Sequence, residues 1–145
     1  MIRTDKRIRL CTALLAMLLV FIWGNSLMPG EVSQAISSWV QHILFGSEAS
    51  AGEIPAGNGI LRKIAHFTEF AALGMTLGWL FGMLQKGRKW PFLAGAAAAS
   101  IDETIQYFVP ERAPRLLDVC IDSCGVLTGI LLLHLGYSYL KKRSA

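Results

Sequence analysis

The segment ILRKIAHFTEFAALGMTLGWLFGML, residues 60–84, is a largely apolar run that nevertheless contains three regularly spaced ionisable side chains. Its length matches the roughly 20 residues that a helix needs to cross a hydrocarbon core of about 30 Å. Lys63, His66 and Glu69 follow one another in its first half. Three residues advance a helix by about 300°, so these side chains form a stripe that drifts by roughly 60° per step. The segment predicts a membrane-spanning helix with a polar edge.

Three further apolar blocks surround this segment, at residues 10–27, 91–109 and 116–140. The chain has 145 residues, of which 53% are hydrophobic and only 17% are charged, too few to provide the polar surface of a soluble domain. A helix satisfies its own backbone hydrogen bonds in lipid. We therefore expect one all-α domain, residues 1–145, folded as a bundle of four transmembrane helices over about 10–27, 60–84, 91–109 and 116–140.

Basic residues are concentrated before the first block, between the second and third, and after the fourth. These three segments hold ten of the 14 Lys and Arg residues. A four-span protein places all three on one side, and the positive-inside rule makes that side cytoplasmic. We therefore expect both termini in the cytoplasm. A net charge of +4 could indicate a nucleic-acid-binding protein, but the concentration of the basic residues in these three segments argues against nucleic acid as a partner.

The first block has an alternative interpretation as a cleaved signal peptide, because basic residues precede its apolar run. However, FIWGNSLMPG, residues 21–30, contains no A-x-A-like cleavage site. We favour a retained first helix.

The first outer segment contains VSQAISSWVQHILFG, residues 32–46, in which apolar residues recur at helical spacing. This pattern predicts an amphipathic helix. It could lie in the outer membrane interface with Trp39 at headgroup level, or pack on the bundle as a lid. The small, polar and glycine-rich residues 46–59 that end this segment predict a loop.

Small residues recur at four-residue intervals in the second and fourth blocks. Such spacing allows helix backbones to approach closely in lipid. We expect these residues to bring the helices together: Gly74, Gly78 and Gly82 in one, Gly125 and Gly129 in the other.

Under this topology, the ionisable residues of three spans lie in the outer half of the membrane. Intramembrane ionisable groups usually pair with one another or serve a function. One hypothesis is a structural ion-pair network; the other, which we favour because the groups outnumber simple pairs, is a polar pocket open to the outside. The candidate catalytic residues are His66 as proton carrier, Glu69 as its orienting carboxylate, and Asp102, Glu103, Asp118 and Asp122 as acid, base or cation-binding groups.

Basic and amide side chains near the same mouth are candidates for binding a substrate. Arginine suits bidentate contact with phosphate or carboxylate. A divalent cation such as calcium or magnesium could bind the carboxylate oxygens, whereas one histidine makes a poor zinc site. The identity of any metal or cofactor stays open. The candidate substrate-binding residues are Lys63, Gln106, Arg112 and Arg115.

The pieces KIAHFTEFAALG, residues 63–74, and IDETIQYFVPERAPRLLDVCIDSCGVLTG, residues 101–129, together resemble the VanZ-like family of bacterial integral membrane proteins. The first span also matches at the pair Asn25 and Ser26. The resemblance covers most of the chain. It identifies as family positions Lys63, His66, Phe67, Glu69, Asp102, Glu103, Gln106, Pro110, Arg112, Asp118, Asp122 and Gly125.

The resemblance implies a multi-pass protein of the bacterial cytoplasmic membrane, in a family whose founding member is associated with low-level resistance to the glycopeptide teicoplanin. We expect an outward-facing polar pocket that recognises or modifies an anionic cell-envelope component. The expected partners are membrane lipids, lipid-linked cell-wall intermediates or a glycopeptide antibiotic. The alternative is a non-enzymatic binding or shielding protein whose charged network is structural, so whether the chain is an enzyme stays open. A small transporter is disfavoured because the inner half shows no polar path.

Overall fold

The chain, represented by a computed structural model, is all-helical over the residues that the structure describes, 2–46, 57–112 and 115–144. This confirms the all-α prediction. The part of the predicted loop at residues 47–56 lies outside the described residues. The helices are α1 (Ile2–Ser26), α2 (Gly30–Phe45), α3 (Gly57–Met83), α4 (Lys89–Tyr107) and α5 (Leu116–Arg143).

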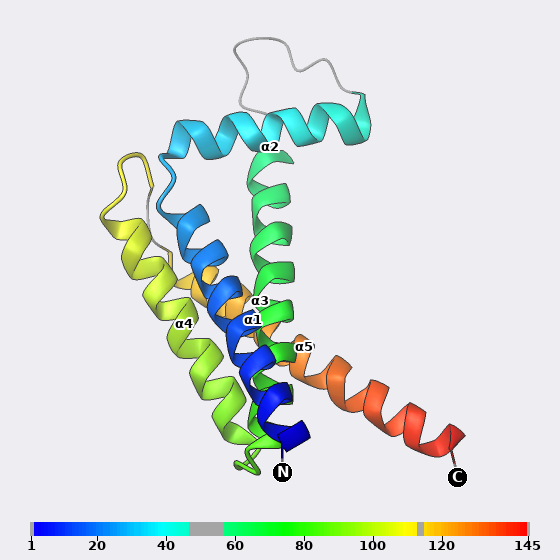
Figure 1. Cartoon of the computed structure of the whole chain (residues 1–145). Coiled ribbons are helices and arrows are strands. Elements are labelled where there is room, and N and C mark those ends of the chain that lie inside the picture. Colours follow the sequence, from blue (N-terminus) through cyan, green and yellow to red (C-terminus); the bar gives the residue numbers. More distant parts are fainter. Residues whose placement is uncertain (1, 47–56, 113–114, 145) are drawn as a thin grey trace.

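The long helices form a bundle that α2 crosses at one end (Figure 1). Helices α1, α3 and α4 run beside one another, while α5 starts against α3 and leans away toward its C-terminal end. Both chain termini lie at the end of the bundle opposite α2 (Figure 1). The turns of the chain thus alternate between the two ends, as an even number of spans requires.

Three helices in the described part of the chain are long and apolar enough to cross a membrane, namely α1 from Asp5, α3 from Gly59 and the whole of α5. Helix α4 is not among them. It is shorter and rich in alanine, and Asp102 and Glu103 lie in its last turns. The fourth span at residues 91–109 therefore stays a prediction.

Close backbone contact between α3 and α5 organises the bundle. A Cβ atom on Gly74 would overlap the Val126 carbonyl oxygen, and one on Gly129 would overlap the Ala71 carbonyl oxygen. At Gly125 the added atom would lie 2.5 Å from the Phe67 carbonyl oxygen. The predicted role of these glycines in tight helix packing is therefore confirmed.

Gly82, at the far end of the same stripe, would meet nothing within 4 Å. This difference follows from the divergence of α5, which separates the two helices toward the end where both termini lie. The tight backbone contact runs along the middle of α3, from Phe67 to Gly74, and so begins next to the polar residues. The fully buried side chains of the apolar core cluster are Ile22, Phe70, Leu73, Ala99 and Val126.

Helix α2 presents one apolar stripe outward and packs its other face over the bundle. Val32, Ile36, Trp39 and Ile43 are exposed, Trp39 by 66%, at the spacing of a single helix face. The start of α2 is attached to the segment after α4, where the Gly30 amide donates to the Pro110 carbonyl at 3.4 Å. The helix is therefore amphipathic, as the sequence predicted.

We expect Gly129→Ala to destabilise the protein, because its Cβ would overlap the backbone of α3. Overpacking of this kind costs about 1–3 kcal/mol. Gly136 lies two turns further along α5 with nothing within 4 Å, so Gly136→Ala is the matched control. The melting temperature is measured in detergent as the temperature at which half of the protein is no longer monodisperse. It should be lower for Gly129→Ala and unchanged for Gly136→Ala. Equal melting temperatures would contradict the packing described above.

Candidate functional site

A cavity of about 270 Å³ lies among α3, α4, α5 and the segment between the last two helices. Side chains of both charges line it, so a bound molecule would meet several positive groups beside acidic ones. Its basic lining consists of Arg62, Lys63, Arg112 and Arg115, and its acidic lining includes Glu103, Asp118 and Asp122. The sequence-based expectation that charged residues of three helices share one region agrees with this geometry.

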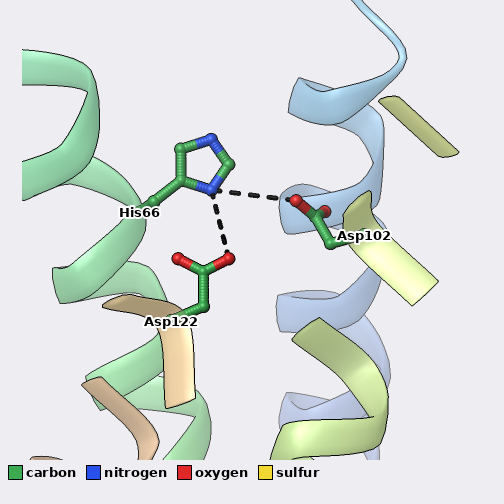
Figure 2. Close-up of side chains that lie close together, drawn as sticks. All are labelled: His66, Asp102 and Asp122. Atoms are coloured by element: carbon green, nitrogen blue, oxygen red, sulfur yellow. Dashed lines mark ion pairs between the residues drawn. The ribbon is translucent and has the colours of Figure 1, made fainter. Parts of the chain in front are cut away.

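His66, Asp102 and Asp122 converge from three different helices (Figure 2). The Nδ1 atom of His66 lies 3.8 Å from Oδ2 of Asp102 and 3.9 Å from Oδ2 of Asp122. Both aspartates are buried, with side-chain exposures of 0% and 1%. One imidazole therefore faces two carboxylates that are shielded from solvent by the protein.

Asp102 is held by a polar network that begins at the end of α1. Ser26 Oγ donates to Asp102 Oδ2 at 2.8 Å, and Gln106 Nε2 donates to the same oxygen at 2.8 Å. The side-chain amide oxygen of Gln106, Oε1, in turn accepts a hydrogen bond from Arg62 Nη2 at 2.8 Å. Because each donor comes from a packed helix, this network fixes the orientation of the carboxylate beside His66.

A second cavity, of about 300 Å³, lies between α2, the end of α1 and α3. Apolar side chains form much of its wall, among them Val40, Leu61 and Ile36, so the exposed apolar stripe of α2 borders this cavity at Ile36. Glu69 faces this cavity and accepts a hydrogen bond from Asn25 Nδ2 at 3.2 Å. Arg62, His66 and Arg112 line both cavities, so these residues stand between a charged space and a largely apolar one.

Arg112 is the basic residue most deeply placed between the two cavities, with 9% exposure. Its Nη2 atom donates to the Asn25 carbonyl oxygen at 3.1 Å, while Nε and Nη1 are buried and have no hydrogen-bond partner among the described residues. Burial lowers the pKa of Arg112 to about 10, and the positive charge of Arg62 acts in the same direction. The guanidinium still carries its charge at neutral pH and has donors to offer.

The structure gives His66 different neighbours from the one expected. The predicted orienting residue, Glu69, is bonded to Asn25, and the carboxylates within 4 Å of His66 are Asp102 and Asp122. Residues three apart on a helix point about 60° apart. That angle directs Glu69 into the second cavity.

The other predicted residues surround the charged cavity. Gln106 is buried in the Asp102 network, and Glu103 accepts a hydrogen bond from the Arg115 amide at 3.0 Å. Asp118 is half-buried, whereas Lys63 and Arg115 have exposed side chains at the rim. All ten candidate residues thus line one of the two cavities or belong to the network between them: Lys63, His66, Glu69, Asp102, Glu103, Gln106, Arg112, Arg115, Asp118 and Asp122.

Sequence reasoning left four participants out of the candidate site. Arg62 lies one turn before His66, and this four-residue spacing could have placed it on the same face. Asn25 and Ser26 form a polar pair at the end of an apolar run, which is also a detectable signal. Glu111, which lines the charged cavity in a left-handed conformation with φ of 62°, belongs to a connecting segment where periodicity gives no guidance.

Comparison with known proteins gives one family. The family model described as VanZ/LLP1 matches residues 11–137, a range that includes every residue of both cavities. No curated protein and no solved structure matches the chain.

We expect Ser26→Ala to lower the stability of the folded protein, because it removes one of the two donors that hold buried Asp102. Loss of a hydrogen bond to a charged group costs about 1.5–3 kcal/mol. Ser100→Ala is the control, since Ser100 is exposed and its hydroxyl bonds only to its own helix. Urea unfolding in detergent would measure both variants, and a Ser26→Ala protein as stable as Ser100→Ala would contradict the network.

Proposed function

The chain belongs to the VanZ/LLP1 family, and we propose that it is a multi-pass membrane protein whose charged cavity recognises or modifies an anionic component of the cell envelope. Membership of this family and three apolar helices of membrane-spanning length indicate a membrane protein.

The proposed topology has four spans, with α4 as the third, and both termini in the cytoplasm of a bacterial cell. The alternation of the connections between the two ends of the bundle supports an even number of spans (Figure 1). The basic segments at residues 3–9, 86–89 and 141–143 support a cytoplasmic location for the end that carries the termini. Helix α2 then lies in the outer interface, with its exposed apolar stripe toward lipid.

The observation that carries the ligand class is the guanidinium of Arg112. A buried arginine with two unpartnered nitrogen atoms is costly unless an acceptor reaches them. Oxyanions match the guanidinium fork better than neutral acceptors do. Arg62 supports the same conclusion, because its charge adds to the positive potential of the same cavity wall.

Two neighbouring cavities of different polarity favour an amphiphilic anion over a free one. The charged cavity suits a phosphate or carboxylate head group, and the cavity beneath α2 suits an attached hydrocarbon chain. Arg112 and His66 line both spaces and would lie at the junction of such a molecule. Lipids and lipid-linked cell-wall intermediates have this chemistry.

His66 is the residue that could make the site catalytic. An imidazole beside two carboxylates can carry a proton near neutral pH, and the carboxylates within 4 Å supply the orienting and acidic groups.

The second candidate function is a protein that binds its ligand without catalysing a reaction and limits the access of a glycopeptide such as teicoplanin. The buried Ser26–Asp102–Gln106 network favours it, because such networks also occur as structural elements.

We expect dioleoylphosphatidylglycerol to bind the purified chain more tightly than the zwitterionic dioleoylphosphatidylcholine. Arg112→Gln should weaken this binding tenfold or more, because a hydrogen bond to a charged group contributes about 1.5–3 kcal/mol and about 1.4 kcal/mol is a factor of ten. Arg143→Gln, an exposed change at the far end of α5, is the control. Native mass spectrometry of the detergent-solubilised protein measures the bound fraction.

The same samples separate the alternatives. Binding of glycerol phosphate as tight as that of the lipid would show that a free anion suffices, and equal binding of both lipids would refute the anionic ligand. A change in lipid mass that is lost in His66→Gln indicates an enzyme, whereas lipid bound without change indicates a binding protein. A lower teicoplanin susceptibility in cells that express the unaltered chain, but not Arg112→Gln, would support the shielding role.

We expect a cysteine at position 31, at the start of α2, to react with an impermeant maleimide in intact cells. A cysteine at position 144, beyond α5, should react only after permeabilisation, because the proposed topology places it in the cytoplasm. Both changes, Glu31→Cys and Ser144→Cys, are made in a chain whose three native cysteines are replaced by serine. Labelling of position 144 from outside would overturn the orientation.

A further inference from the structure

Two buried aspartates beside one imidazole present more carboxyl oxygens than the surrounding donors satisfy. Both carboxylate oxygens of Asp122 are buried without a hydrogen-bond partner among the described residues, although the side chain is only 1% exposed. Oδ1 of Asp102 is also buried and has no hydrogen-bond partner among the described residues. Ser26 and Gln106 donate only to Oδ2 of Asp102. The cluster therefore presents buried oxygen acceptors that a cation would satisfy.

A protonated histidine alone does not meet this need. Hydrogen bonds from nitrogen to oxygen span about 2.7–3.2 Å, and Nδ1 of His66 lies 3.8 and 3.9 Å from the two carboxylate oxygens. One imidazolium also supplies a single charge to two carboxylates. Each uncompensated buried ion carries a penalty of several kcal/mol.

The spacing of the three side chains instead fits ligands around one ion. One ligand atom each from His66, Asp102 and Asp122 lies within 4.8 Å of the other two. Figure 2 shows the imidazole and the carboxylates directed toward a common point from three helices. Protein nitrogen and oxygen atoms bind divalent metals at about 2.0–2.6 Å, so small side-chain rotations would bring all three atoms into contact with an ion between them.

We propose that His66, Asp102 and Asp122 bind one divalent metal ion, with the imidazole Nδ1 and one oxygen of each aspartate as protein ligands. Two carboxylates neutralise the charge of such an ion. One imidazole nitrogen among the ligands favours a first-row transition ion over Ca²⁺, because Ca²⁺ takes six to eight oxygen ligands and imidazole suits ions such as Fe²⁺ and Zn²⁺. Mn²⁺, which the two carboxylates suit, is the probe ion for the test below. The donors on Ser26 and Gln106 would orient Asp102 as a ligand, a role that usually matters for affinity.

The remaining coordination positions would face the charged cavity, which both His66 and Asp122 line. An oxygen of a ligand held by Arg112 could then also bind the ion. This use of the metal rests on the proposed function, whereas occupation of the site by a metal does not. The two ideas can therefore fail separately.

The test uses the full chain in detergent, stripped with a chelator and titrated with Mn²⁺ alone, without added lipid or anion. Electron paramagnetic resonance of free Mn²⁺ should show one bound ion per chain, and electron-spin-echo spectra should show coupling to a histidine nitrogen. His66→Gln should remove that coupling, while His134→Gln, on the exposed part of α5, should retain it. Zn²⁺ should displace the bound Mn²⁺.

Asp122→Asn should weaken Mn²⁺ binding at least tenfold, whereas Glu31→Gln, which changes an exposed carboxylate at the start of α2 that lines neither cavity, should not. Mn²⁺ should also raise the melting temperature of the unaltered chain and of Glu31→Gln, but not that of Asp122→Asn. If Asp122→Asn does not fold, the nitrogen coupling of the unaltered chain and its loss in His66→Gln decide the question.

The inference is overturned if the folded, unaltered chain binds neither Mn²⁺ nor Zn²⁺ stoichiometrically, or if binding is indifferent to His66→Gln and Asp122→Asn. If Arg112-dependent lipid binding persists in that case, only the metal is lost. If the metal binds and lipid does not, the metal site stands and the proposed function falls.

Discussion

Close packing of α3 on α5 sets the positions of the charged residues that these two helices contribute to the candidate site. Gly74, Gly125 and Gly129 leave room for one helix backbone against the other, and a methyl group at any of them would collide with a carbonyl oxygen. Asp122 lies one turn before Gly125 on the same helix, so the separation fixed by these glycines also fixes the distance from Asp122 to His66. Packing between small residues therefore positions charged ones.

That geometry brings together groups that would each be unfavourable alone. Asp102 and Asp122 are buried between helices, and Arg112 is buried with two nitrogen atoms that have no partner among the described residues. A region evolved only for stability would pair these groups directly, because unpaired buried charges are strongly destabilising. The unsatisfied donors on Arg112 and the unsatisfied acceptors on Asp122 line one cavity without pairing, which supports the proposed binding site.

The sequence predicted the helices and the glycine contacts because both follow from local periodicity. It predicted that the charged residues lie in one region because successive helices run in opposite directions. The start of α3, the end of α4 and the start of α5 therefore lie at the same end of the bundle. It did not predict which carboxylate faces His66, since Glu69 is close along the helix but Asp102 and Asp122 are close in space. That choice depends on helix rotation and on the partners of Asp102, which come from α1 and from a residue one turn along α4.

The rotation of α3 also explains why two cavities of different polarity meet at the same residues. Arg62 and His66 are four residues apart and share a face, and this face borders both spaces. Lys63 is directed to the charged side and Glu69 to the largely apolar side, where Asn25 holds it. A single helix therefore forms the boundary between a polar and an apolar compartment. A molecule with a charged head and a hydrocarbon chain would match this boundary because each part has a compartment of suitable polarity.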